Sequence, residues 1–202
     1  MSIQDANQSQ IRIDEFKGKK AVVKGVRHPG VPVLRRLEWW MLSREAEILQ
    51  RLEEIEQVPD FLGYPEPFSF AMEWRAGESL RQVDPSELEE SFFLELEETV
   101  DAIHRSGVTH SDLKRKENLI VSPDGRPVLL DFGASFRKKP WFRPLNNWLY
   151  NQFKRIDLNA VAKYKQRYAP QLCDEQDRRR LAEPVLLEKI SRFGRRYILF
   201  RE

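Results

Sequence analysis

Two kinds of hydrophobic spacing alternate along the chain. Residues 11–26, "IRIDEFKGKKAVVKGV", have the composition of two strands, with Gly18 in the turn that joins them. Residues 61–74 hold one or two further short strands. Between these segments, residues 33–55 have the spacing of a helix, with apolar side chains at positions 34, 37, 41, 42, 48, 49, 52 and 55. The pattern therefore predicts a small sheet with one helix in the first part of the chain.

A long second helix is predicted in the middle of the chain. Asp84 is its expected N-cap, with Pro85 at the first helical position, and Gly107 ends it. The stretches "NLIV" and "PVLL" then predict two short strands, and "SPDG" between them has the composition of a hairpin turn. After Ala134 the pattern is helical again, in about three segments.

This order of elements predicts an α+β fold with two lobes. Residues 1–74 are expected to form an N-lobe of strands with one helix, and residues 75–202 a mostly helical C-lobe that contains the hairpin. A chain of 202 residues suits two small lobes that share a cleft. Hydrophobic residues make up 41% of the sequence and charged residues 33%, which is typical of a globular protein.

Two further features indicate where the protein works. Cys173 is the only cysteine in the sequence, which excludes an internal disulfide and a Cys-x-x-Cys metal site. The first residues, "MSIQDANQSQ", lack the pattern of a secretory signal, and no apolar run approaches the length that spans a bilayer. We therefore expect a cytoplasmic protein.

Charge is distributed unevenly along the chain. Residues 1–135 contain 17 Lys and Arg against 25 Asp and Glu, whereas residues 136–202 contain 17 against 7. This asymmetry indicates either an anionic partner near the C-terminal part or a basic segment that packs on the acidic one. The arginine-rich stretches "DRRR" and "GRRY" come with no nucleic-acid-binding motif, so nucleic acid is not an expected partner.

One of the predicted C-terminal helices has an apolar face with basic flanks. The apolar positions are Leu145, Trp148, Leu149, Phe153 and Ile156, and the flanking cations are Arg143, Lys154 and Arg155. Such a helix is suited to a membrane interface, where its cations would meet anionic lipid. The alternative is that the face completes the core, which is the expectation for Trp148 and Leu149.

Five residues, in one order along the chain, are suited to phosphoryl transfer. This chemistry needs a metal to neutralise phosphate charge, a cation to hold phosphate oxygens and a carboxylate to orient the attacking hydroxyl. Lys24 ends a predicted strand, and Glu45 lies in the following helix. Asp112 and Asn118 belong to "HSDLKRKEN", and Asp131 opens "DFG" after the hairpin.

Together these residues resemble the signature of the protein-kinase-like superfamily, over roughly residues 20–135. The stretch "HSDLKRKENLIV…RPVLLDFGAS" is similar to small atypical bacterial kinases, namely the lipopolysaccharide-core (Kdo and heptose) kinases and the RIO-like kinases. The resemblance implies a two-lobed kinase-like fold with a reduced N-lobe and a truncated helical C-lobe. It also implies ATP and Mg²⁺ as cofactors.

The resemblance implies a role for each residue. Asp112 would be the catalytic base, Lys24 would hold the α- and β-phosphates with Glu45 as its partner, and Asn118 with Asp131 would bind Mg²⁺. Glu47 is a rival to Glu45 for the pairing with Lys24. The stretch "MEWRAG" resembles the hinge that binds adenine through its backbone, which makes Glu73 and Trp74 cofactor-binding candidates. His110 is expected to support the backbone near Asp131, and His104 to pack in the core.

The chain departs from the kinase pattern at four places. No glycine-rich loop precedes Lys24, and no Ala-Pro-Glu follows Asp-Phe-Gly. Ser111 stands where the family usually has Arg, so switching by phosphorylation of an activation loop is not expected. Asn118 lies one residue later than usual and Glu117 occupies its place, which we assign to a bulge at Arg115–Lys116. Whether Asn118 or Glu117 binds metal stays open.

The sequence thus predicts an ATP-dependent phosphotransferase that acts on a hydroxyl group. The preferred acceptor is a sugar of the lipopolysaccharide core, which implies an anionic glycolipid partner and peripheral contact of the basic C-terminal half with the inner face of the membrane. The alternatives are a serine/threonine protein kinase of RIO-like type and a pseudokinase that binds nucleotide or a partner without turnover.

Overall fold

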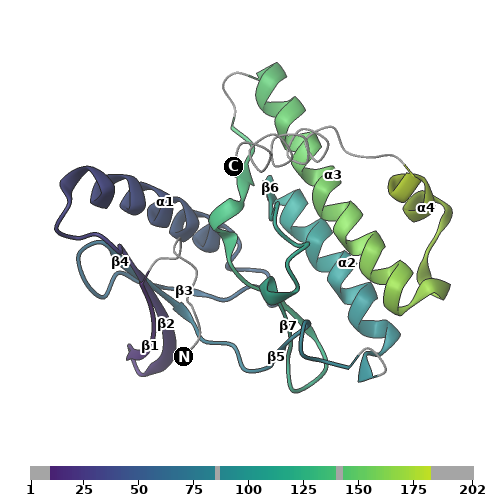
Figure 1. The fold of residues 1–202 in the computed structure, drawn as a ribbon, viewed down its shortest axis with the longest axis horizontal. Helices are drawn as coiled ribbons and strands as arrows, with labels where there is room; N and C mark the ends of the chain where they lie inside the picture. Colours follow the sequence, from purple (N-terminus) through teal and green to yellow (C-terminus); the bar gives the residue numbers. More distant parts are fainter. Residues whose placement is uncertain (1–9, 85–86, 140–142, 183–202) are drawn as a thin grey trace, which may run out of the picture.

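The first sheet of the protein forms one side of an α+β fold (Figure 1). The structure is a computed structural model that describes residues 10–84, 87–139 and 143–182. Its first sheet is antiparallel in the order β1-β2-β4-β3. The strands are β1 (Gln10–Phe16), β2 (Lys19–Gly25), β3 (Phe61–Gly63) and β4 (Ser69–Glu73).

A two-residue turn joins β1 to β2. Lys17 and Gly18 have φ angles of 53° and 73°, the left-handed pair that matches the twist of a tight hairpin. The register pairs Ile11 with Lys24 and Ile13 with Val22, so these four side chains share one face of the sheet. This face turns toward the cleft described below.

Helix α1 (Pro32–Arg51) packs on the sheet through one side (Figure 1). Its buried side carries Leu42, Ala46, Ile48 and Leu49, and Glu45 is buried among them. The predicted helix reached residue 55, but α1 ends at Arg51 and the chain turns at residues 52–54. An acidic side chain on the buried side of a helix needs a partner, which indicates a polar site at this position.

The rest of the fold is mostly helical. Helix α2 (Glu90–Arg105) packs against the long α3 (Arg143–Tyr168), and α4 (Glu175–Ala182) packs on α3 (Figure 1). A three-stranded sheet has the order β5-β7-β8, and a two-stranded one pairs β6 with β9. These strands are β5 (Glu78–Ser79), β6 (Val108–Thr109), β7 (Leu119–Val121), β8 (Pro127–Leu129) and β9 (Phe136–Arg137).

The predicted start of the second helix was wrong. Helix α2 begins at Glu90 with Glu89 as N-cap, whereas the carbonyl of Asp84 accepts a hydrogen bond from the Glu87 amide at 3.0 Å in a separate turn. Pro85 lies outside the described residues. The end was predicted correctly, because Gly107 follows the helix with a left-handed φ of 74°.

The apolar face of α3 divides between core and surface. Ile156 is buried and Phe153 stacks on Phe136, with ring centroids 5.2 Å apart. The expectation that Trp148 completes the core is wrong, because 43% of its surface is exposed. No helix in the described part of the chain is long and apolar enough to cross a membrane. The predicted lobe boundary at residue 74 stays a prediction, although β4 ends at Glu73.

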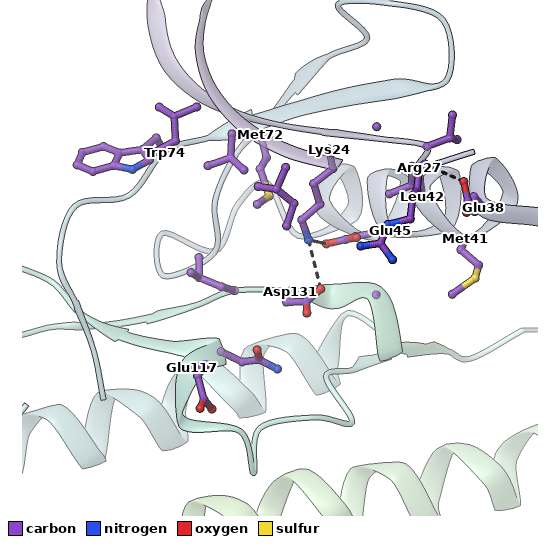
Figure 2. A pocket seen from close by; sticks show the side chains of 18 of the residues that line it. Lys24, Arg27, Glu38, Met41, Leu42, Glu45, Met72, Trp74, Glu117 and Asp131 are labelled. Carbon is purple, nitrogen blue, oxygen red and sulfur yellow. Dashed lines mark hydrogen bonds and ion pairs between the residues drawn. The ribbon is translucent and has the colours of Figure 1, made fainter. Parts of the chain in front are cut away.

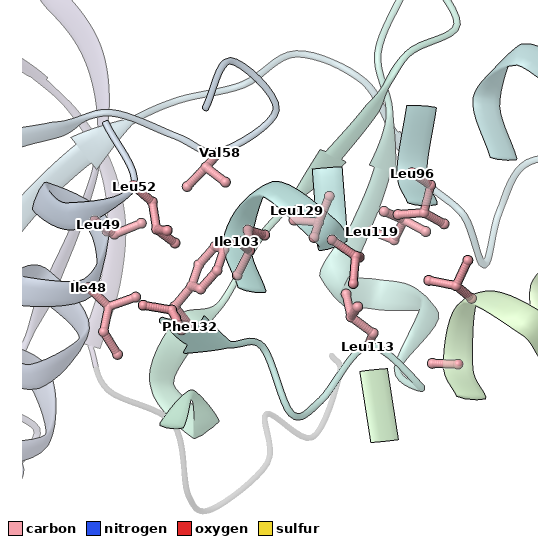
Figure 3. Close-up of a cluster of buried hydrophobic side chains, with 14 of the residues drawn as sticks. Ile48, Leu49, Leu52, Val58, Leu96, Ile103, Leu113, Leu119, Leu129 and Phe132 are labelled. Atoms are coloured by element: carbon pink, nitrogen blue, oxygen red, sulfur yellow. The ribbon is translucent and has the colours of Figure 1, made fainter. Parts of the chain in front are cut away.

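One hydrophobic cluster runs from α1 through the hairpin to α2 and α3 (Figure 3). Phe132 lies between the α1 residues Ile48 and Leu49 and the α2 residue Ile103 in this cluster, and only 1% of it is exposed (Figure 3). Since Phe132 follows Asp131 directly, core packing fixes the place of that carboxylate.

Gly77, between β4 and β5, should be intolerant of substitution. Its φ is 141°, and a Cβ atom there would collide with the carbonyl of Val121 and the side chain of Ile120. We expect Gly77→Ala to lower the free energy of unfolding by about 2 kcal/mol or more, measured by urea denaturation. The control is Gly30→Ala, because a Cβ atom at Gly30 meets nothing within 4 Å. Equal losses in the two variants would contradict this account.

Candidate active site

A pocket of about 740 Å³ lies between the first sheet, α1 and the β7–β8 hairpin (Figure 2). One end is lined by Met72, Glu73 and Trp74 at the end of β4. The other end is lined by the first half of α1 and the loop that precedes it. Lys24 projects between these ends (Figure 2).

Three charged groups from three elements meet in this pocket (Figure 2). The Nζ of Lys24, on β2, lies 2.6 Å from Oε1 of Glu45 on α1 and 3.2 Å from Oδ1 of Asp131. Lys24 is 5% exposed and Glu45 is 4% exposed. The rival Glu47 is exposed and lies 3.5 Å from Arg137 instead. The structure therefore pairs Lys24 with Glu45.

The electrostatics of this group favour a bound cation. Burial lowers the pKa of the Lys24 ammonium, but Glu45 and Asp131 outweigh that effect and hold the pKa above its ordinary value. Burial raises the pKa of Asp131, yet the Lys24 ammonium and the Gly133 amide bring it below its ordinary value. Burial raises the pKa of Glu45 above its ordinary value, against the opposing effect of the Lys24 ammonium. Asp131, with its lowered pKa, is therefore the carboxylate of this group that is suited to a divalent metal ion that neutralises phosphate.

Asp131 takes its position from an unusual backbone conformation. Its φ is 61°, in the left-handed region, just before the short 3₁₀ helix η3 (Phe132–Ala134). On the other side, Nε2 of His110 lies 2.8 Å from the carbonyl of Leu130, and the His110 ring packs 4.7 Å from that of Phe132. His110 thus supports the backbone around Asp131, as the sequence predicted.

The loop that carries Asp112 is anchored by a carboxylate of α3. Asp157 is 0% exposed and accepts hydrogen bonds from the amides of His110 at 2.8 Å and Ser111 at 2.7 Å. Its Oδ2 also lies 3.1 Å from Nε2 of the buried His104. Ser111 has a left-handed φ of 70°, a strained conformation that these contacts maintain. Asp112 follows Ser111 directly, so the contacts of Asp157 also fix the position of Asp112.

Asn118 joins Asp112 to the pocket. Its Nδ2 donates to the carbonyl of Asp112 at 3.0 Å and lies 3.3 Å from Oδ2 of the same residue. Asn118 lines the pocket, whereas Asp112 does not. Because Nδ2 faces Asp112, the carbonyl oxygen of Asn118 is the atom left to meet a metal ion. Hard amide and carboxylate oxygens from Asn118 and Asp131 fit Mg²⁺, which keeps water and phosphate oxygens as its other ligands.

The extra residue before Asn118 is absorbed in a 3₁₀ turn. The turn η2 (Lys116–Asn118) replaces the predicted bulge, and the Asn118 amide donates to the carbonyl of Arg115 at 3.0 Å. Glu117 pairs with Arg81 at 2.5 Å and points away from Asp131 (Figure 2). The geometry favours Asn118 over Glu117 as the metal ligand. In the described part of the chain, no three His, Cys, Asp or Glu side chains form a metal site by themselves.

The predicted hinge closes the opposite end of the pocket. The amide of Glu73 donates to Asp60 at 2.8 Å and that of Trp74 to Lys20 at 3.1 Å, so neither of these two N–H groups faces an adenine ring. Lys20, on β2, packs its ammonium 3.4 Å from the centre of the Trp74 ring. Adenine binding by Glu73 and Trp74 stays a prediction, and it would use other atoms of this segment.

No protein-family model matches the chain. The chain is 32% identical to serine/threonine-protein kinase D of Synechocystis sp. over 100 residues, which is 46% of this chain and 20% of that protein. It is 35% identical to CBL-interacting protein kinase 5 of Oryza sativa subsp. japonica over 105 residues, 48% of this chain and 23% of that protein. The chain thus spans less than a quarter of the length of these relatives.

The solved structures decide the fold. Rio2 kinase from Chaetomium thermophilum, in an ADP/Mg²⁺-phosphoaspartate complex, matches with a TM-score of 0.60 at 16% identity, over 86% of this chain and 56% of that chain. A second Rio2 structure from the same organism gives a TM-score of 0.58 at 17% identity, over 80% and 54%. The chain has the protein-kinase-like fold. The predicted fold class is therefore confirmed, while a relation to lipopolysaccharide kinases stays a prediction.

Sequence reasoning missed two residues that shape the candidate site, Arg27, which lines the pocket, and Asp157, which anchors the loop before Asp112. Arg27, in the loop after β2, extends beside Glu45, on the side of Lys24 away from Trp74 (Figure 2). Its amide donates to Oε2 of Glu38 at 2.8 Å. Its only sequence signal is a second cation three residues after Lys24. Asp157 has no comparable signal, because an acidic residue in a helix is ordinarily solvated.

The wall of the kinase-like cleft that faces Ile120 is apolar. Ile13 and Val22 share one face of the sheet and line the pocket, together with Met72 on β4. Ile120, on β7, lines the pocket from the hairpin side. These four apolar side chains line a part of the pocket that is suited to a flat ring.

The ionisation of Asp112 should determine the acid limb of the pH profile of any activity. Burial raises the pKa of Asp112 above its ordinary value, and Arg115, whose Nε lies 3.3 Å from Oδ2, opposes this. Because the base must be ionised, the rate should fall as the pH drops through the raised pKa. Removing the cation in Arg115→Gln raises that pKa further, so we expect the acid limb of kcat/KM to move to higher pH.

The control for this pH profile is Arg81→Gln. Arg81 pairs with Glu117 and is 71% exposed, so its loss should leave the acid limb in place. An identical acid limb in the wild type and Arg115→Gln would contradict the assignment of Asp112 as the base.

Proposed function

We propose that the protein is an ATP- and Mg²⁺-dependent phosphotransferase that transfers the γ-phosphate to a hydroxyl group. The observation that carries the proposal is the buried ion pair of Lys24 with Glu45 at 2.6 Å, with the more exposed Asp131 3.2 Å from the same ammonium, inside a pocket large enough for a nucleotide. An ion pair buried to this degree is weak as a source of stability, which favours a functional role. The kinase names of the curated relatives support the same activity.

Each residue of the site would have its own role in the reaction. The adenine ring would lie between Val22 and Ile120. In this position the phosphates would extend from the Trp74 end of the pocket toward Lys24. Lys24 would hold phosphate oxygens, with Glu45 keeping its ammonium charged and in place. Asp131 and Asn118 would hold Mg²⁺, which supplies neutralisation of the phosphate charge. Asp112 would orient the acceptor hydroxyl and accept its proton.

The preferred acceptor is a sugar hydroxyl of the lipopolysaccharide core, and a protein serine or threonine is the second candidate. The similarity of the catalytic stretch to the lipopolysaccharide-core kinases favours the first acceptor. The serine/threonine-kinase names of the relatives in Synechocystis favour the second. The reaction would take place in the cytoplasm, at the inner face of the membrane if the acceptor is a glycolipid.

Transfer from γ-labelled ATP tests the function directly. The wild type and Asp131→Ala are incubated with Mg²⁺ and a whole cell-envelope extract, and label is followed into glycolipid and protein fractions. We expect label in the glycolipid fraction that Asp131→Ala loses, because the metal site lacks its carboxylate. Label in protein bands alone would make serine or threonine the acceptor. Nucleotide binding without transfer to any fraction would indicate a pseudokinase.

Arg27 should hold the terminal phosphate in place of a glycine-rich loop. It lies at the phosphate end of the pocket, beyond Lys24 as seen from Trp74 (Figure 2). Loss of a charged hydrogen bond costs about 1.5–3 kcal/mol. We therefore expect Arg27→Met to weaken Mg²⁺-ATP binding by about tenfold or more. Binding of Mg²⁺-ADP should change much less, since ADP lacks the γ-phosphate.

Calorimetric titration of both nucleotides measures this difference. The matched control is Arg36→Met, because Arg36 is an exposed arginine of α1 that does not line the pocket. Equal weakening of ATP and ADP by Arg27→Met would give Arg27 a structural role instead.

A further inference from the structure

Exposed hydrophobic side chains concentrate on one side of α1. Among the described residues, five of the twelve exposed large hydrophobic side chains belong to this helix: Val33, Leu34, Leu37, Trp40 and Met41. Their spacing forms a stripe along the helix, beside the buried side that packs on the sheet. Leu34, Leu37 and Met41 line the active-site pocket, whereas Trp40 does not, so the exposure of Trp40 indicates a second surface that binds something.

The stripe continues onto the start of α3. Trp40 lines a hollow of about 550 Å³ between α1 and α3, together with Phe136, Leu145 and Leu149. Trp40 is 56% exposed, Leu145 62% and Trp148 43%. Trp40 and Leu145 are thus exposed where they line the hollow, and Trp148 is exposed one turn along α3 from Leu145 without lining it.

Cations line the same hollow. Arg44, Arg137 and Lys139 belong to its wall, and Glu47 is the only carboxylate among its lining residues. The guanidinium of Arg44 lies 5.0 Å from the centre of the Trp40 ring and donates to the carbonyl of Ser135 at 3.1 Å. Glu47 lies 3.5 Å from Arg137. The hollow therefore has a net positive charge.

We propose that Trp40, Leu145 and Trp148, with Arg44, Arg137 and Lys139, form a docking surface for an anionic lipid bilayer. We call these six residues the α1–α3 face. Tryptophan is enriched where water meets lipid, and arginine and lysine beside it reach anionic headgroups. Apolar side chains that project between cations are the pattern of a protein that lies on a membrane without crossing it.

Two other occupants fit the α1–α3 face less well. The centre of a protein–protein interface is depleted of charge, whereas here Trp40 shares its hollow with three cations. A second copy of the chain would place the same cationic hollow against itself around a twofold axis, and like charges would repel. An anionic surface matches both the apolar and the cationic part.

The proposal does not depend on the phosphotransferase activity, since no residue of the α1–α3 face lines the candidate active site. It does bear on that site. Leu37 and Met41, on the same stripe of α1, line the mouth of the active-site pocket. Docking through the α1–α3 face would therefore bring the pocket mouth close to the lipid surface.

Vesicle co-sedimentation tests the proposal with the full chain. Vesicles of phosphatidylcholine alone are compared with vesicles that also contain phosphatidylglycerol, at low and high salt. We expect binding to the anionic vesicles only, weakened by salt. Trp40→Gln with Leu145→Gln should reduce this binding by about tenfold or more, since two apolar anchors are lost. Lys139→Gln should reduce it about fivefold.

Matched substitutions away from the face serve as controls. Leu94→Gln replaces a 47% exposed leucine of α2, and Lys163→Gln replaces an exposed lysine far along α3. Neither should change binding, and circular dichroism establishes that all variants are folded.

Three results would overturn the proposal. The first is no binding to anionic vesicles, and the second is equal binding by the face variants and the controls. The third is a dimer, seen by light scattering without lipid, that Trp40→Gln abolishes, because the face would then belong to a second copy. Mg²⁺-ATP titration of the same samples reports on the active site separately, so failure of the two proposals is distinguishable.

Discussion

The arrangement of the candidate site depends on one buried carboxylate, that of Asp157. It is completely buried on α3 and accepts hydrogen bonds from two consecutive backbone amides, those of His110 and Ser111. A buried carboxylate without donors would be costly, and the amides would likewise be left unsatisfied without it. This mutual requirement ties the loop before Asp112 to the helical part of the protein. His104 on α2, 3.1 Å from the same carboxylate, adds a third element to the anchor.

The second constraint runs through the hydrophobic core. Phe132 is buried between α1 and α2, and this packing holds Asp131 in its left-handed conformation next to Lys24. Glu45 reaches the same lysine because it lies on the buried side of α1. The polar contacts of the site are therefore consequences of apolar packing on either side of it. A shift of α1 along the sheet would separate Glu45 from Lys24 before it exposed much of the core.

Sequence reasoning predicted the features that local motifs encode and missed the features that depend on long-range packing. The kinase-like fold and the pairing of Lys24 with Glu45 followed from short motifs in a fixed order, whereas the catalytic roles of these residues remain predictions. Asp157 was missed because its amide partners lie 46 and 47 residues earlier in the sequence. The start of α2 was misplaced because a helix-start signal in the sequence at Asp84 does not fix where the helix begins, and α2 begins at Glu90. Trp148 was assigned to the core because spacing alone does not tell which end of an apolar face is covered.

Helix α1 connects the candidate active site with the proposed docking surface. Glu45 lies on its cleft side, while Arg44, the preceding residue, belongs to the α1–α3 face. Lys24 and Glu45 meet only when α1 is in place, so a ligand that stabilised this position of α1 from its outer side would also favour the paired state. In that case linkage would make a nucleotide held by Lys24 favour docking through the α1–α3 face by the same factor. If the proposed activity and docking both hold, a lipid surface would confine phosphoryl transfer to the place where a membrane-bound acceptor is present.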